Sequence, residues 1–270
     1  MKIPFQKMHG TGNDFVVLDG RKHKLNMTDE LVKRLCDRHF GIGCDQLVVL
    51  AEPKEADVAM RIFNADGSEI STCGNATRCV ADLIMNETGK THVRMETLAG
   101  IRTGSRADGG VVTVNMGTPK TGWQEIPLSE SRNTLHLGLQ VGLLSDPVAV
   151  NMGNPHAVFF VRDLAHIKMA EWGAKLEHNP LFPEAANISA VEVIDTSTLK
   201  MVVWERGTGI TLACGSAACA AVVAGSLRDL CYRKSTVQLP GGTLQIDWTH
   251  DGDVMMTGPV AYVFDGEIEI

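Results

Sequence analysis

The sequence predicts two α+β domains of similar size. Its 270 residues exceed the length of about 150 residues that is typical of one domain. Strand-like and helix-like segments follow one another without the strict alternation of a doubly wound parallel sheet, which favours α+β domains. Landmarks of the first half also recur 141 residues later in the second half. A duplicated α+β domain accounts for all three observations.

Short apolar and β-branched runs predict strands in both halves. The runs of the first half are Asp14–Leu18, Gln46–Leu50, Val58–Phe63 and Val111–Asn115. Those of the second half are Ala157–Val161, Leu199–Trp204, Val237–Leu239 and Val254–Met256. The two sets are equal in number, which supports two related units.

Four segments have the character of helices. They are Thr28–His39, Gly74–Asn86, Asp163–Leu176 and Gly215–Leu230. Thr28 is a suitable N-cap, and the acidic residues after it suit a first turn. Gly207–Leu227 carries no charge over 21 residues, but four Gly and four Ser or Thr residues favour a packed core helix over a membrane span.

Four pairs of landmarks share one register of 141 residues. Each pair joins a residue or short motif of the first half to its counterpart in the second half: Asn13 and Asn154, Ile62-Phe63 and Val203-Trp204, Cys73-Gly74 and Cys214-Gly215, and Gly117 and Gly258. A constant offset of this kind indicates an internal repeat. Residues Thr118–Pro127 are the expected connection between the halves.

Charge and cysteine content narrow the function classes. The net charge of −7 argues against a nucleic-acid partner, which requires a basic surface. Seven cysteines are an odd number, and no apolar run follows Met1-Lys2 as in a signal peptide. These features predict reduced thiols in a cytoplasmic protein, not a disulfide framework.

Cys73 and Cys214 each stand where an apolar run, a polar loop and a predicted helix meet. A helix N-terminus lowers the pKa of a cysteine there and can also bind a carboxylate. Cys79 and Cys219 follow after six and five residues, which does not suit paired zinc ligands, so we expect no metal site. Taken alone, either Cys73 or Cys214 could be structural; their equivalence in the repeat favours a function.

Two domains that face each other across a cleft would bring two thiols to opposite sides of one ligand. One thiolate could remove the α-proton of an amino acid while the other thiol returns a proton to the opposite face, which inverts the stereocentre. Two other classes remain open on the residues alone. They are a thiol redox protein and a duplicated binding module without turnover.

The motifs around these cysteines resemble those of the diaminopimelate epimerase family. They run in family order along nearly the whole chain: His9-Gly10-Thr11-Gly12-Asn13-Asp14-Phe15, Gly41-Ile42-Gly43-Cys44-Asp45-Gln46, Phe63-Asn64-Ala65-Asp66-Gly67-Ser68-Glu69, Cys73-Gly74-Asn75, Gly153-Asn154-Pro155-His156, Glu205-Arg206-Gly207 and Ala213-Cys214-Gly215-Ser216. Ile210 and Ala217 depart from the family pattern, which commonly has Glu and Gly there.

The resemblance implies a fold and an activity. Each of two pseudo-symmetric domains would wrap a curved mixed sheet around a central helix, with the active site in the interdomain cleft. The domains would be residues 1–117 with 263–270, and residues 118–262. The chain would epimerise L,L-diaminopimelate to the meso form for lysine and peptidoglycan synthesis. It would need no cofactor and would form a homodimer. Another two-thiol enzyme, such as a proline racemase or hydroxyproline epimerase, is the alternative.

The resemblance also assigns roles to residues. Cys73 and Cys214 would be the acid and base, and His156 and Glu205 would modulate their protonation. The substrate would be bound by Asn13, Gln46, Asn64, Gly74, Asn75, Asn154, Asn187, Glu205, Arg206, Gly215 and Ser216. Each has a structural alternative: the asparagines could be turn residues, Glu205-Arg206 a surface pair and His156 a buried core histidine.

Overall fold

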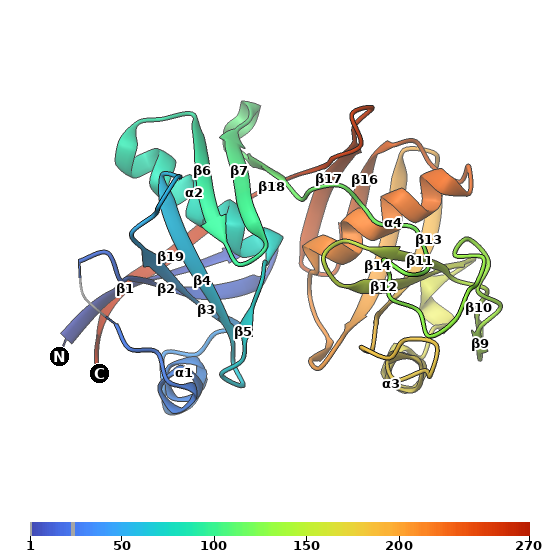
Figure 1. Cartoon of the computed structure of the whole chain (residues 1–270), viewed down its shortest axis with the longest axis horizontal. Helices are drawn as coiled ribbons and strands as arrows, with labels where there is room; N and C mark the ends of the chain where they lie inside the picture. Colours follow the sequence, from blue (N-terminus) through green and yellow to red (C-terminus); the bar gives the residue numbers. More distant parts are fainter. Residues whose placement is uncertain (1, 23–24) are drawn as a thin grey trace. The chain divides into compact units, whose positions relative to one another are not determined.

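The chain divides into two compact units. The computed structural model describes residues 2–22 and 25–270. The first unit runs to Val114 and also includes Thr257–Ile270, whereas the second is Asn115–Met256. Both units are mixed α+β structures in which strands predominate (Figure 1). The α+β fold predicted from the sequence is therefore confirmed.

The first unit contains most of the strands of the N-terminal half and the last strand of the chain. Its elements are β1 (Lys2–Gly10), β2 (Asn13–Asp19), α1 (Asp29–Cys36), β3 (Gln46–Ala51), β4 (Val58–Asn64), β5 (Glu69–Ile70), α2 (Gly74–Thr88), β6 (His92–Thr97), β7 (Gly100–Arg106), the 3₁₀ turn Asp108–Gly110, β8 (Val112–Asn115) and β19 (Ala261–Glu269). Strand β19 pairs antiparallel with β1, so the first and last strands of the chain lie side by side in this unit.

The second unit is built from the remaining elements. They are β9 (Gln140–Val141), β10 (Leu144–Ser145), β11 (Val148–Asn151), β12 (Pro155–Val161), the 3₁₀ turn Leu164–His166, α3 (Met169–Glu177), β13 (Asn187–Asp195), β14 (Thr198–Glu205), β15 (Gly209–Ile210), α4 (Gly215–Leu227), β16 (Lys234–Leu239), β17 (Gly242–Trp248) and β18 (Val254–Gly258).

The strands of the two units pair in the same order and sense. In the first unit, β2 is parallel to β3, β3 is antiparallel to β4, β4 is parallel to β6 and β6 is antiparallel to β7. In the second unit, β12, β13, β14, β16 and β17 repeat this series. Strands β3 and β13 begin at Gln46 and Asn187, and helices α2 and α4 begin at Gly74 and Gly215, again 141 residues apart. The sequence repeat is therefore a structural repeat.

One buried helix lies against the strands of each unit. Helix α2 packs on β1, β6 and β7, and α4 packs on β11, β12, β13, β14, β16 and β17 (Figure 1). Residues Ala217–Gly225 of α4 are all buried. A helix that is apolar on every side needs such an enclosure, which explains the long uncharged stretch in the sequence. Within the described residues, no helix is long and apolar enough to cross a membrane.

The remaining helices lie on other faces and are shorter than the sequence suggested. Helix α1 ends at Cys36 because Asp37 has an extended backbone and accepts hydrogen bonds from the amides of His39 and Phe40. The predicted helix Asp163–Leu176 is instead a 3₁₀ turn followed by α3. The Asp163 side chain caps the 3₁₀ turn by accepting a hydrogen bond from the Ala165 amide. Ile167 has an extended backbone and separates this turn from α3.

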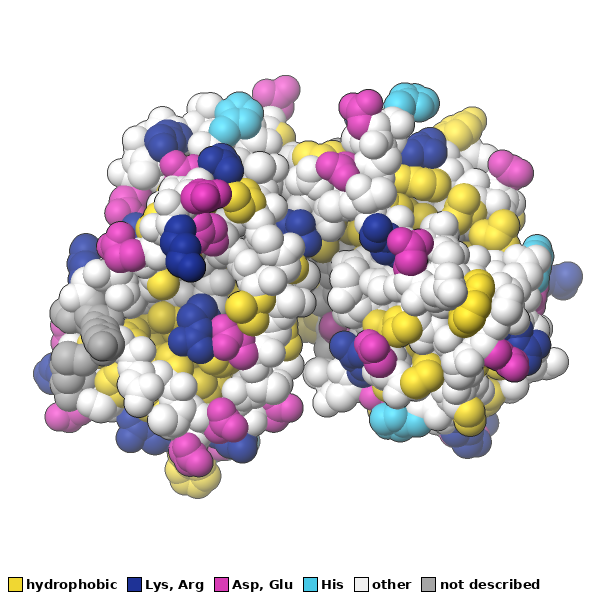
Figure 2. Space-filling view, in the orientation of Figure 1, with side chains coloured by type: hydrophobic (Ala, Val, Ile, Leu, Met, Phe, Trp, Pro, Cys, Tyr) yellow, Lys and Arg dark blue, Asp and Glu magenta, His cyan; other side chains and the backbone are white. Residues whose placement is uncertain are grey.

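Acidic and basic side chains are mixed on the surface. On the face of the first unit drawn in Figure 2, Lys and Arg side chains alternate with Asp and Glu. Ion pairs of this kind include Arg61 with Glu69 and Lys90 with Asp57. On this face, positive side chains are therefore interspersed with negative ones (Figure 2).

Candidate active site

Cys73 and Cys214 occupy the same place in the two units. Each is the N-cap residue of a central helix, with an extended backbone (φ −144° at Cys73 and −125° at Cys214). The carbonyl of each accepts the first helical hydrogen bond, from Thr77 in α2 and from Ala218 in α4. Each thiol therefore lies at the end of a helix where backbone N–H groups point outward and the helix dipole is positive.

Asn13 contacts the Cys73 thiol, and Asn75 in turn bonds to Asn13. The Sγ of Cys73 lies 3.7 Å from the Oδ1 of Asn13, at the start of β2. That same oxygen accepts a hydrogen bond of 3.2 Å from the Nδ2 of Asn75, in the first turn of α2. Asn75 is buried, whereas Cys73 is partly exposed. The structure thus brings Asn13 next to Cys73 and Asn75, which lie 60 and 62 residues further along the chain.

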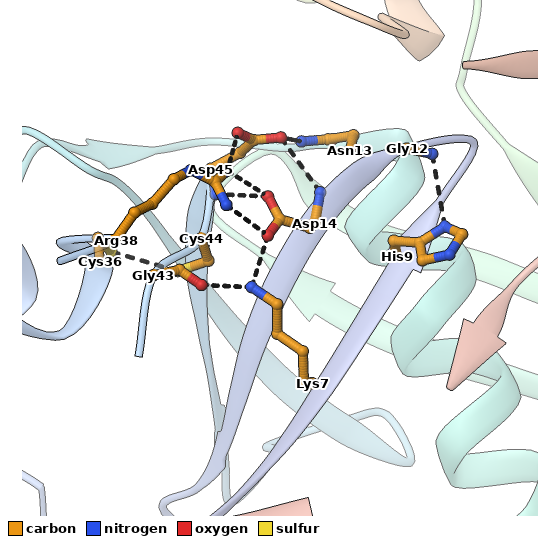
Figure 3. Close-up of polar contacts among 10 residues, drawn as sticks. All are labelled: Lys7, His9, Gly12, Asn13, Asp14, Cys36, Arg38, Gly43, Cys44 and Asp45. Carbon is orange, nitrogen blue, oxygen red and sulfur yellow. Dashed lines mark hydrogen bonds and ion pairs between the residues drawn. The ribbon is translucent and has the colours of Figure 1, made fainter. Parts of the chain in front are cut away.

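A network of charged side chains fixes the amide nitrogen of Asn13. The Nδ2 of Asn13 donates to the Oδ2 of Asp45 at 3.0 Å (Figure 3). Arg38 bonds to both Asp45 and Asp14, at 2.7 Å in each case. Lys7 completes the network by donating to Asp14 and to the carbonyl of Gly43. The turn that begins β2 is therefore fixed by two carboxylates and two cations.

Asp14 is the centre of this network. Burial alone would raise the pKa of its carboxyl group, but hydrogen bonds from Arg38 and Lys7 outweigh this effect. The pKa of Asp14 consequently lies well below its usual range. An ionised Asp14 beside two cations is expected, because each cation stabilises the charged form.

Gln46 and Asn64 form a second polar pair in the first unit. They are register partners at one end of β3 and β4. The Nε2 of Gln46 donates to the Oδ1 of Asn64 at 3.0 Å, and Asn64 in turn donates to Ser68. The Oε1 of Gln46 is buried and has no hydrogen-bond partner in residues 2–22 and 25–270. A buried oxygen of this kind is available to accept a hydrogen bond from a ligand.

Cys214 lies in a drier and more negative environment than the sequence suggested. It is only 5% exposed, and its Sγ contacts the Oγ of Ser216 at 3.5 Å. Burial, followed by the negative charge of Glu205, raises its pKa well above that of an ordinary thiol. Hydrogen bonds from Ser216 and the Ala217 amide offset only part of this rise. The expected lowering of the pKa by the helix N-terminus is therefore wrong for Cys214.

Several hydrogen bonds fix the end of β14 and the residues that follow it. Thr211 donates a hydrogen bond to the carboxylate of Glu205. The Oδ1 of Asn187 accepts from the backbone amide of Arg206 at 3.0 Å, and the Nη1 of Arg206 donates to the carbonyl of Glu184 at 2.8 Å. Asn187 also donates to the carbonyl of Pro155. This segment is held from both sides, so Glu205 and Arg206 are not a loose surface pair.

His156 is a buried neutral histidine. Burial and then the positive charge of Arg206 lower its pKa from 6.5 to about 3. Its Nε2 contacts the Oδ1 of Asn154 at 2.8 Å, and its Nδ1 has no hydrogen-bond partner in the part of the chain that is described. His156 therefore orients Asn154, and neither of its ring nitrogens is hydrogen-bonded to a thiol.

The other five cysteines lie in the interior of their units. Cys79 and Cys219 are fully buried, and burial raises the pKa of Cys79 to about 12. The Sγ atoms of Cys36 and Cys44 lie 3.5 Å apart, and Cys231 is also buried. These positions are typical of small core residues. Among the described residues, no group of three or more His, Cys, Asp or Glu side chains could hold a metal ion.

Several residues that support the site were not singled out from the sequence. They are Lys7, Asp14, Arg38, Asp45, Glu177 and Thr211. Asp14 and Asp45 lie inside motifs that the resemblance rested on, so proximity to Asn13 and Gln46 was the available signal. Ile210, where the family pattern has Glu, is 54% exposed, whereas Ala217 is fully buried.

Comparison with known proteins places the chain in a family. A family model described as diaminopimelate epimerase matches residues 5–122 and 148–263. The diaminopimelate epimerase of Acidiphilium cryptum (strain JF-5) is 50% identical over 266 residues, which cover 98% of this chain and 96% of that protein. The diaminopimelate epimerase of Rhodospirillum centenum (strain ATCC 51521 / SW) is 49% identical over 267 residues, covering 98% and 91%.

Solved structures share the fold at low sequence identity. A phenazine biosynthesis protein from Bacillus anthracis covers 100% of both chains with a TM-score of 0.71 and 17% identity. A hydroxyproline epimerase from Agrobacterium vitis covers 99% of this chain and 91% of its own, with a TM-score of 0.71 and 15% identity. The duplicated fold, the motifs around both cysteines and the full-length similarity agree: the chain belongs to the diaminopimelate epimerase family.

Proposed function

We propose that this protein epimerises L,L-diaminopimelate to meso-diaminopimelate by removing and returning a proton at one α-carbon. The observation that carries the proposal is the equivalence of Cys73 and Cys214. Each is the N-cap residue of the central helix in one of two units with the same strand order. An inversion by two bases needs one acid–base group for each face of the α-carbon, and this duplication supplies a pair.

The backbone around each cysteine suits an amino-acid carboxylate. Gly74 and Gly215 follow the cysteines directly, so their N–H groups lie in the first turns of α2 and α4. Such groups bind anions and stabilise the negative charge that develops as the α-proton leaves. Glycine adds no Cβ and lets a ligand approach the backbone.

We infer that Cys214 is the proton donor in one direction of the reaction and Cys73 the base. Burial and the Glu205 carboxylate raise the pKa of Cys214, so this residue holds its proton at rest. Cys73, which is partly exposed, removes the α-proton as a thiolate. The C–H electron pair remains on carbon, and the S–H proton of Cys214 then forms the new C–H bond on the opposite face. The reverse reaction exchanges the two roles.

The polar residues around the thiols would select the substrate. In this proposal, Asn13, Asn75, Gln46 and Asn64 bind it from the first unit. Asn154, Asn187, Arg206 and Ser216 bind it from the second. Arg206 would pair with the distal carboxylate and Glu205 with an ammonium group, as charge complementarity favours. His156 and Glu205 would set the protonation of the thiols.

The remaining parts of the proposal concern context. We propose that the reaction needs no metal or other cofactor, that the protein is a cytoplasmic homodimer, and that it serves lysine and peptidoglycan synthesis. The two catalytic domains would be residues 1–117 with 263–270, and residues 118–262. The names of the 50% and 49% identical relatives support the substrate assignment.

Isotope exchange in heavy water tests the proposal. Purified protein is incubated with L,L-diaminopimelate, with L-proline or with trans-4-hydroxy-L-proline, and deuterium at the α-carbon is measured by NMR. We expect exchange and formation of the meso isomer from diaminopimelate alone. Exchange with proline or hydroxyproline but not with diaminopimelate would identify the alternative two-thiol enzyme. Binding without any exchange would identify a binding module, and reversible Cys73–Cys214 disulfide chemistry without exchange would identify a redox protein.

A further inference from the structure

Glu177 is a buried carboxylate that the proposed chemistry does not use. It is the last residue of α3 and is only 6% exposed. Burying a charged group is costly unless hydrogen bonds replace its water. Its partners therefore indicate what the residue is for.

Both carboxylate oxygens of Glu177 accept hydrogen bonds from one short segment. The Oε2 accepts from the Nε1 of Trp204, and the Oε1 accepts from the backbone amide of Gly207, each at 2.7 Å. Hydrogen bonds to an ionised carboxylate are about twice as strong as those between neutral groups. Trp204 comes directly before Glu205-Arg206, and Gly207 comes directly after.

Further contacts keep this segment next to α3. A Cβ at Gly173, one turn before Glu177, would lie 2.7 Å from the Cβ of Trp204, so only glycine permits this close approach. The carbonyl of Glu177 accepts from the amide of Ala186 at 3.0 Å. Ala186 precedes Asn187, which holds the amide of Arg206. The end of α3 and the start of β13 therefore bracket residues 204–207.

A surface ion pair does not account for Glu177. His178 lies 3.8 Å from its Oε2, but the His178 side chain is 75% exposed. An exposed pair of this kind contributes little to stability. The two short hydrogen bonds to Trp204 and Gly207 are the main contacts of the carboxylate, and both lead to the segment that carries Glu205 and Arg206.

We propose that Glu177 is a positioning residue that fixes Trp204 and Gly207 and thereby holds Glu205 beside Cys214 and Arg206 toward the substrate. This inference rests on the proposed function for the roles of Glu205 and Arg206. Small displacements of such groups are costly, since an error of about 1 Å can lower a rate by about 100-fold.

The variant Glu177→Gln isolates this role because it keeps the size of the side chain. An amide has one acceptor oxygen and one donor nitrogen, so it cannot accept from both Trp204 and Gly207. Glu177→Asp keeps two acceptors on a shorter side chain. Glu171→Gln is the matched control, since Glu171 lies on the same helix and its side chain is 51% exposed and paired with Lys175 at the surface.

Two measurements test the proposal on the full-length protein. The first is kcat and KM with L,L-diaminopimelate. We expect Glu177→Gln to lower kcat/KM by about 10- to 100-fold. Displacement of Arg206 should raise KM, and displacement of Glu205 should lower kcat. Glu177→Asp should recover part of the loss, and Glu171→Gln should match the wild type. The second is hydrogen–deuterium exchange of a peptide spanning residues 204–209, which should become faster in Glu177→Gln only.

The outcomes separate the two proposals. Wild-type kinetics in Glu177→Gln would overturn the positioning role. A lower kcat with an unchanged KM and unchanged hydrogen–deuterium exchange of residues 204–209 would also overturn it, because a loss of folded protein alone gives that pattern. A wild-type protein without activity on diaminopimelate would overturn the proposed function instead. Faster exchange in Glu177→Gln would then still support the fixing of residues 204–207 by Glu177.

Discussion

Asn13 connects the carboxylate of Asp45 to the thiol of Cys73. Its Nδ2 donates to Asp45 at 3.0 Å, while its Oδ1 lies 3.7 Å from the Cys73 Sγ. Because the amide is fixed at its nitrogen end, the oxygen end is directed at the thiol. Asp45 therefore helps to orient the Asn13 amide toward Cys73, although Asp45 itself is half exposed.

Replacing Asp45 by Ala should weaken catalysis without unfolding the protein. Asn13 loses the acceptor that fixes its Nδ2, which loosens its amide, so we expect kcat/KM to fall by about 10-fold, the equivalent of one hydrogen bond of roughly 1.4 kcal/mol. Steady-state kinetics with L,L-diaminopimelate provide the measurement. Asp247→Ala, which removes a carboxylate from a surface pair with Lys234, is the control and should be unaffected. Equal kinetics in both variants would contradict a role for Asp45.

Single replacement of Cys73 or Cys214 by Ala should abolish epimerisation. Removal of a general acid or base typically costs about 10²- to 10⁴-fold in rate, and neither thiol has a substitute in its own unit. Circular dichroism should show an unchanged fold. Cys79→Ala, at a fully buried position one and a half turns along α2, should stay active. Turnover in both Cys73→Ala and Cys214→Ala would rule out the two-thiol mechanism.

Thr211 should act through Glu205. Its hydroxyl donates to the Glu205 carboxylate, so Thr211→Val removes a hydrogen bond of about 1 kcal/mol and should lower kcat/KM by about 3- to 10-fold. Thr211→Ser keeps the hydroxyl and should stay near the wild-type value. Steady-state rates compare the two variants directly. A loss in Thr211→Ser but not in Thr211→Val would assign the effect to packing of the methyl group.

Stability should fall as the pH decreases below 6.5, in part because of His156. The folded protein holds this histidine at a pKa of about 3, whereas the unfolded chain has the ordinary value of about 6.5. The unfolded state therefore binds one more proton between these values, and this group lowers the free energy of unfolding by up to about 1.4 kcal/mol per pH unit.

His156→Gln removes this titration. Urea unfolding at pH 7.5, 6.0, 5.0 and 4.5 should therefore show a shallower loss of stability for the variant than for the wild type. The comparison uses the difference between the two slopes, because other groups titrate in both proteins. Parallel slopes would mean that the imidazole is protonated in the folded state.

Gly173→Ala should destabilise the second unit despite the better helix propensity of Ala. The new Cβ would lie 2.7 Å from the Cβ and 2.8 Å from the Cγ of Trp204. Overpacking of this kind costs about 1–3 kcal/mol, more than the gain of about 1 kcal/mol from helix propensity. Thermal unfolding should show a lower Tm. An unchanged or higher Tm would mean that α3 can move away from Trp204.

The repeat register made much of the fold predictable. An offset of 141 residues placed Cys73 and Cys214 at equivalent helix starts, and the structure has both as N-cap residues. The strands with regular apolar runs, such as β3 and β4, were also predicted. Strands β1 and β19 were not, because β19 exposes Tyr262, Val263 and Phe264 and its pairing with β1 joins the two ends of the chain.

The electrostatics of the site depend on burial, which the sequence did not reveal. The motif around Cys214 indicated a helix N-terminus and hence a lower pKa. The structure buries the thiol next to Glu205, and these effects reverse the direction. Likewise Glu177 lies in a stretch without a recognisable motif, and its importance is visible only from its two partners in space.

The 141-residue register also shows where the two halves have ceased to be alike. Asn64 ends β4 and Glu205 ends β14, at the same position of the repeat. Duplication alone would have produced two identical thiols with no reason for one to begin as acid and the other as base. An amide in one copy and a carboxylate in the other make the surroundings of the two cysteines differ, and in the proposed mechanism the carboxylate favours Cys214 as the initial acid.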